Sequence, residues 1–117
     1  MLLQTAVVGL LGGLVLIAVL STLLANTSAY FVLGDEAEFR QAVPPGVAMA
    51  LVGLTAAVLP AAAVIALALV VDAVMVRLAY GLDRRGTAMI TAMHYALTVI
   101  AAVGVQRVLA VYQTAPV

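Results

Sequence analysis

The sequence predicts an all-α protein: an integral membrane bundle of four transmembrane helices, in one domain over residues 1–117. Hydrophobic residues make up 67% of the chain and charged residues 9%, whereas soluble domains are about half apolar and a quarter charged. A soluble domain of this size could not bury so much apolar surface, because small domains keep a large ratio of surface to volume. The apolar stretches are also long enough for helices to cross a lipid core about 30 Å thick. We therefore expect a multi-pass protein of the cell membrane.

The first predicted helix covers residues 3–25. It lacks the basic start of a signal peptide, and its apolar run is longer than the usual run of about 7 to 15 residues. We therefore expect a retained membrane helix. It ends in a polar patch that is expected to meet the lipid headgroups: Ser21, Thr22, Asn26, Thr27 and Ser28.

A charged linker follows at residues 34–43. Asp35 is expected to cap a short interfacial helix, with Glu36 and Glu38 in its first turn, because the helix dipole favours acidic residues there. The apolar tract 47–80 comes next. As one helix it would be about 51 Å long, more than one crossing requires.

Pro60 lies near the middle of this tract, and proline breaks a helix interior but suits a first turn. The main prediction is therefore two helices, at about 42–58 and 60–80. The alternative has three crossings, with one long kinked helix over 47–80.

The turn "GLDRRG", residues 81–86, is bracketed by glycines and filled with charges, a pattern typical of loops. The last predicted helix covers residues 87–112. Arg84 and Arg85 are interpreted as topology determinants that place this turn on the cytoplasmic side. Arg77, one turn from the interface, can extend its guanidinium to the headgroups.

Asp72 and His94 are ionisable residues inside the two helices that this turn joins. Asp72 is eleven positions before Asp83, and His94 is ten after Arg84. In an antiparallel hairpin these positions lie at nearly the same depth, about 15 Å from the turn. The sequence therefore predicts an intramembrane polar pair.

A polar stripe supports this pairing. Thr87, Thr91, His94 and Thr98 are spaced by four, three and four residues, so they share one helix face, and such a face should meet protein and not lipid. Two roles remain open for Asp72 and His94: a hydrogen bond that locks the helices, or a proton or ion site. A metal site is disfavoured, because one histidine supplies too few ligands.

Other function classes find little support. The net charge is zero, so nucleic acid is not an expected partner, and no catalytic motif or cofactor site is apparent. We expect a structural or interaction role in the membrane without catalysis; the alternative is a small transporter or channel subunit that uses Asp72 and His94. The expected partners are the lipid bilayer and either a second copy of the chain or another membrane protein.

Two small-residue spacings, Gly9 with Gly13 and Gly53 with Ala57, predict close helix packing within the chain or between copies.

The stretch "VLGDEAEFRQAV", a proline-bearing apolar helix, "YGL" and a last helix near "HY" together resemble small uncharacterised multi-pass membrane proteins of haloarchaea. The lysine-free composition, rich in alanine and valine, is also similar. The same order loosely resembles Yip-type membrane proteins, which implies a multi-helix fold and a link to membrane trafficking. The likeness covers about residues 32–112 and transfers no catalytic residue.

Overall fold

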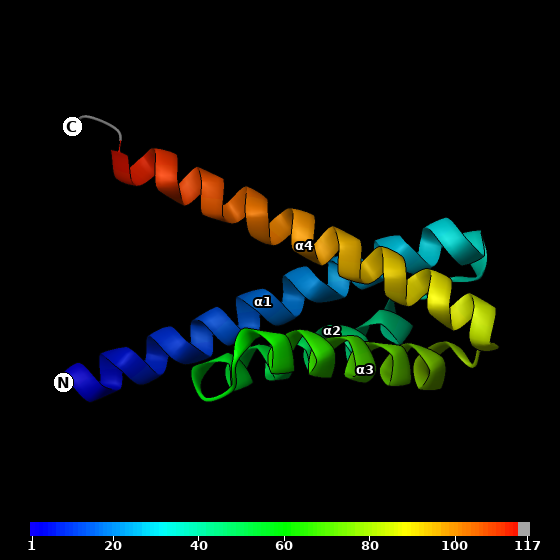
Figure 1. Ribbon diagram of the computed structural model, residues 1–117, viewed down its shortest axis with the longest axis horizontal. Coiled ribbons are helices and arrows are strands. Elements are labelled where there is room, and N and C mark those ends of the chain that lie inside the picture. Colours follow the sequence, from blue (N-terminus) through cyan, green and yellow to red (C-terminus); the bar gives the residue numbers. More distant parts are fainter. Residues whose placement is uncertain (115–117) are drawn as a thin grey trace.

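The structure, a computed structural model, describes residues 1–114 and is helical throughout, with no strand in that range. This confirms the predicted all-α bundle (Figure 1). Four α-helices and two 3₁₀ turns follow one another: α1 Leu2–Leu33, η1 Gly34–Glu36, α2 Phe39–Leu54, η2 Thr55–Ala57, α3 Ala61–Tyr80 and α4 Arg84–Thr114.

The four helices run up and down. The connections α1–α2 and α3–α4 lie at one end of the bundle, and both chain ends lie toward the other (Figure 1). Each helix contacts the next in sequence, and α4 returns to contact α1. Within the described residues, no comparable contact joins α1 to α3 or α2 to α4. The two diagonal pairs are therefore held apart by their neighbours, as in a four-helix bundle.

α1 continues to Leu33, eight residues beyond its predicted end at 25. The expectation that its polar patch meets the headgroups is wrong for Ser21, Thr22 and Ser28, which are buried. The hydroxyls of Thr22 and Ser28 donate to the carbonyls of Ala18 and Leu24, one turn earlier, at 2.7 and 2.8 Å. Because these hydroxyls are satisfied inside the helix, they can pack against protein without a polar partner elsewhere.

Glu38, and not Asp35, caps the second helix. The Glu38 side chain accepts from the backbone N–H of Gln41, while the Gln41 side chain accepts from the Glu38 N–H at 3.0 Å. This reciprocal arrangement is a capping box. It lets α2 begin at Phe39, so the second half of the predicted linker 34–43 is helical.

Residues 47–80 divide into two helices. α2 ends at Leu54, η2 follows, and Pro60 precedes α3 in an extended conformation, with φ −65° and ψ 154°. Proline here needs no N–H partner and begins the next helix. The chain then folds back, so that α2 and α3 pack against each other and no single kinked helix spans this tract.

The last connection is shorter than the predicted turn 81–86. Gly81 ends α3 in a left-handed conformation, with φ 63°, and its N–H donates to the Arg77 carbonyl. Asp83 caps α4, because its Oδ1 accepts from the Gly86 N–H at 2.8 Å. This cap allows α4 to start at Arg84, three residues before the predicted start at 87.

α1 and α2 approach each other closely at Gly46. A Cβ added to Gly46 would lie 2.5 Å from the Thr22 Cα and 2.6 Å from its backbone nitrogen. Gly9, Gly13 and Gly53, by contrast, would place a Cβ in open space. Their predicted role in packing within the chain is therefore wrong.

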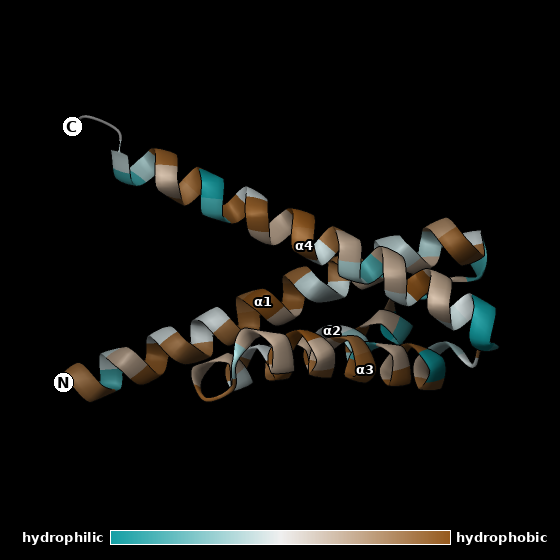
Figure 2. Ribbon diagram, in the orientation of Figure 1, coloured by the Kyte–Doolittle hydropathy of each residue, from teal (hydrophilic) through white to brown (hydrophobic). Residues whose placement is uncertain are grey.

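Many large apolar side chains are exposed. Hydrophilic residues gather at the end that holds the two charged connections (Figure 2). Three helices are long and apolar enough to cross a membrane: α1, extended through η1 to Glu36, α3 and α4. The first half of α1 and the second half of α4 diverge from each other (Figure 1). Their apolar side chains are exposed along the full length of these two arms, residues 1–11 and 102–114.

Candidate functional site

The candidate site is centred on the two ionisable residues inside the bundle. His94 Nδ1 lies 2.8 Å from Oδ1 and 2.9 Å from Oδ2 of Asp72. Both side chains are fully buried, with no exposed surface. The sequence predicted this pair because the two positions lie at equal depth in the α3–α4 hairpin, and the structure brings the two side chains together. With a proton on Nδ1, this nitrogen donates to both carboxylate oxygens, so the acid has a hydrogen-bond partner inside the protein.

The other ring nitrogen of His94 reaches a third helix. Nε2 lies 3.1 Å from the backbone oxygen of Ser21 and 3.2 Å from its Oγ. An imidazolium would donate from Nε2 to the carbonyl, whereas a neutral ring protonated on Nδ1 would accept from the hydroxyl. In either form the imidazole links α1, α3 and α4, although the backbones of α1 and α3 are not adjacent.

Sequence reasoning placed Ser21 in the headgroup patch and missed this contact. One signal could have found it: Ser21, Ala25 and Ser28 are spaced by four and three residues, so they form a small, polar face on α1. All three are buried.

Most of the predicted stripe on α4 faces the interior of the bundle. Thr87 and Thr91 are buried, and Thr98 is partly buried with its hydroxyl donating to the His94 carbonyl at 2.7 Å. The hydroxyl oxygens of Thr87 and Thr91 are buried without a hydrogen-bond partner, as is that of Tyr80. Buried hydroxyls usually have a partner, so these three leave hydrogen-bonding capacity unused near the α3–α4 connection.

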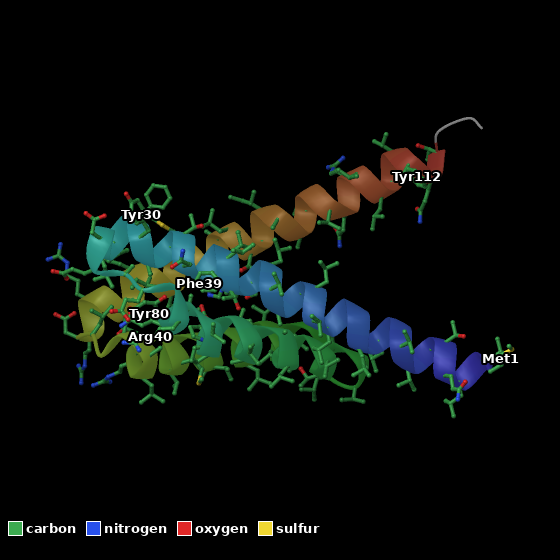
Figure 3. The ribbon with its side chains drawn as sticks, turned by 180° about the vertical axis from the view of Figure 1, so that it is seen from behind. Met1, Tyr30, Phe39, Arg40, Tyr80 and Tyr112 are labelled. Carbon is green, nitrogen blue, oxygen red and sulfur yellow. The ribbon has the colours of Figure 1, made fainter. Side chains whose placement is uncertain are left out.

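The arginines of the charged end differ in their partners. Arg40 pairs with Glu38 at 2.6 Å on the surface. Arg77, Arg84 and Arg85 are exposed, and across residues 1–114 none of them forms a side-chain ion pair. Arg40 and Tyr80 lie at the same end of the molecule, opposite Met1 and Tyr112 (Figure 3).

An apolar cleft of about 360 Å³ opens between α1 and α4 where the two helices diverge. Ser21 and Thr98 contribute hydroxyls to a lining that is otherwise mostly aliphatic: Ile17, Leu20, Leu24, Ala101, Ala102, Val105 and Gln106. Ser21, which contacts the buried imidazole, is therefore also one of the residues that line this open cleft.

The order carboxylate, imidazole and hydroxyl is also that of a hydrolase triad. Two features oppose nucleophilic catalysis by Ser21. Its own carbonyl competes for His94 Nε2 at a slightly shorter distance, and its neighbours' N–H groups are bonded within α1, so the helix offers no backbone oxyanion hole. Among the described side chains, no three histidine or acidic groups are placed to hold a metal ion.

No curated protein and no solved structure matches the chain. One family model does: the family of unknown function DUF7473 matches residues 4–116. These comparisons show neither the haloarchaeal nor the Yip-type likeness. Since the match covers nearly the whole sequence, the chain belongs to the family of unknown function DUF7473.

Proposed function

We propose that this protein is a multi-pass protein of the cell membrane with no catalysis of its own, which serves as a structural or interaction partner there. The observation that carries the proposal is the complete burial of Asp72 and His94. Each binds the other, and His94 also binds Ser21. An ionised group inside a membrane costs about 2.5–3.5 kcal/mol on insertion scales, and this closed arrangement lowers that cost while it fixes the helices.

The helix lengths favour four crossings. α2 has 16 residues, a length of about 24 Å, and the three residues of η2 add about 6 Å. Together they approach the lipid core of about 30 Å. Because α1 and α3 run in the same direction, α2 must return the chain from one end of the bundle toward the other. The alternative has three crossings, made by α1, α3 and α4, with α2 too short to cross.

The charged end is proposed to be cytoplasmic. Arg40, Arg77, Arg84 and Arg85 belong to this end, whereas Arg107 lies far along α4. An excess of arginine marks the cytoplasmic side of membrane proteins. Both chain ends of the described structure then lie toward the external side.

The diverging arms of α1 and α4 are the proposed interaction surface. Their apolar side chains lack partners within the described structure, and Gly9 and Gly13 leave room for a backbone to approach. Lipid, a second copy of the chain and another membrane protein are the candidate partners. The resemblance to haloarchaeal and Yip-type membrane proteins supports the same multi-helix class.

A proton or ion pathway is the second candidate function. It is favoured by Ser21, whose hydroxyl lies 3.2 Å from His94 Nε2 and which is one of the residues that line the open cleft. A proton could pass from that cleft to the imidazole through one hydroxyl. No further acidic residue or histidine lies inside the described bundle to continue the path.

Proton flux in liposomes separates the two functions. We would reconstitute wild type, Asp72→Asn, His94→Ala and the control Thr27→Ala, whose exposed hydroxyl only donates within α1, and follow internal pH with a trapped dye. The structural role predicts no flux above that of empty liposomes, together with lower unfolding temperatures for Asp72→Asn and His94→Ala. Flux in wild type and Thr27→Ala that is lost in the other two variants would establish the pathway and contradict the structural role.

A further inference from the structure

A cavity of about 300 Å³ lies between α3 and α4 at the charged end of the bundle, apart from the Asp72–His94 pair. Two helix faces form it. On α3, Ala73, Val74 and Arg77 share a face by their spacing of three and four residues, and on α4, Arg84, Thr87 and Ala88 do the same. Each face thus brings one arginine to the cavity.

The polar groups of this cavity have unused binding capacity. Neither Arg77 nor Arg84 forms an ion pair or a side-chain hydrogen bond with the described residues. Thr87 is 8% exposed, lines the cavity, and has a buried hydroxyl oxygen without a partner. Threonine in a helix adopts two rotamers, and the site proposed below requires the one that turns this hydroxyl toward the ligand.

The local field favours an anion. The cavity lies at the first turn of α4, where backbone N–H groups carry a partial positive charge. Asp83 is the nearest acidic residue in the sequence, and its Oδ1 already accepts from the Gly86 N–H. Because Asp83 caps this helix end, attraction of an anion rests on the side chains. Phosphate is bound by groups such as the two guanidinium groups and the hydroxyl found here.

We propose that Arg77, Arg84 and Thr87 form a phosphate-binding site, and that its ligand is the phosphate of an anionic lipid headgroup. The lipid source rests on the proposed membrane function, because that function puts the arginine end at the headgroups of the cytoplasmic leaflet. Anionic lipids concentrate in that leaflet and attract basic residues beside membrane helices.

Lipid retention measured by native mass spectrometry tests this site. The protein would be purified in a neutral detergent, mixed with phosphatidylglycerol or phosphatidylcholine, and compared with the double variant Arg77→Gln/Arg84→Gln and with Thr87→Val. Arg85→Gln and Arg107→Gln are the matched controls, since each removes one arginine that does not line the cavity. All the substituted arginines are exposed, so thermal unfolding without added lipid should be unchanged.

We expect wild type to retain phosphatidylglycerol in preference to phosphatidylcholine. Loss of both arginines should weaken retention about 150-fold, at about 1.5 kcal/mol for each hydrogen bond to a charged group, and Thr87→Val about tenfold, for one such bond. The two controls should bind like wild type. The proposed site would be wrong if the double variant retained phosphatidylglycerol as well as wild type does. It would also be wrong if Arg85→Gln lost as much retention as the double variant.

Inorganic phosphate distinguishes the source of the ligand. Excess phosphate competes for the site whichever ligand it serves, so inorganic phosphate is instead offered without lipid. If wild type retains phosphatidylglycerol but not inorganic phosphate alone, the headgroup is the ligand; retention of inorganic phosphate alone that is lost in the double variant would mean that the lipid assignment is wrong. A failure of the membrane function would look different, because the protein would then remain soluble and monomeric once detergent is removed.

Discussion

His94 binds Asp72 through Nδ1, 2.8 Å from the nearer carboxylate oxygen, and the same ring reaches Ser21 through Nε2. These partners belong to α3 and α1, the diagonal helices of the bundle, which have no Cα atoms within 8 Å of each other in the described structure. One imidazole on α4 therefore connects three of the four helices. In the proposed membrane setting, apolar packing alone does not make the helices prefer one another over lipid, and a polar connection of this kind favours the observed arrangement.

The serine of this connection is predicted to be structural. Ser21→Ala removes the hydroxyl but keeps the carbonyl that His94 also faces, so the free energy of unfolding should fall by about 1 kcal/mol or less. A fluorophosphonate probe, which labels activated serines, should leave the wild-type protein unlabelled. Labelling that disappears in Ser21→Ala would instead identify a nucleophile and contradict the proposed absence of catalysis.

Gly46 should be the least tolerant glycine of α2. A Cβ there meets the backbone of Thr22, which cannot move away as a flexible side chain would, and overpacking costs about 1–3 kcal/mol. Gly46→Ala should lower the unfolding temperature measured in detergent. Gly53→Ala is the matched control on the same helix, since its Cβ enters open space and alanine favours the helix; equal effects would refute the close α1–α2 approach.

The cap of α4 predicts a difference between two substitutions at one residue. Asp83→Ala removes the acceptor of the Gly86 N–H and should cost about 0.5–2 kcal/mol of stability, whereas Asp83→Asn keeps an acceptor and should cost little. Chemical denaturation monitored by circular dichroism measures both. If asparagine were as damaging as alanine, the cap would not explain where α4 begins.

Much of this fold follows from one-dimensional patterns. The break at Pro60, the end of the third helix at Tyr80 and the depth of Asp72 and His94 follow from proline chemistry, glycine brackets and the helical rise. The length of α1 could not be predicted from such patterns. Ser21, Thr22 and Ser28 look like a headgroup patch unless their burial against other helices is known. The partner of His94 Nε2 was missed for the same reason: a contact between residues 73 positions apart depends on how α1 and α4 cross, which no local pattern encodes.

Membrane topology can be tested directly, because the chain has no cysteine. Arg40→Cys and Leu59→Cys each introduce a single thiol, at the start of α2 and just before α3. With four crossings, an impermeant maleimide should label position 40 from the cytoplasmic side and position 59 from the external side. Labelling of both positions from one side, or protection of position 59 from both sides, would mean that α2 does not cross.

The most direct measurement is a double-mutant cycle on the buried pair. The free energy of unfolding in detergent would be measured for wild type, Asp72→Ala, His94→Ala and the double variant, with Asp72→Ala combined with Thr27→Ala as the control cycle. A helix-locking pair predicts a coupling energy of about 1–2 kcal/mol, with each single variant unstable because it leaves a buried polar group unpaired. Additive effects within about 0.5 kcal/mol, as for independent sites, would contradict the account.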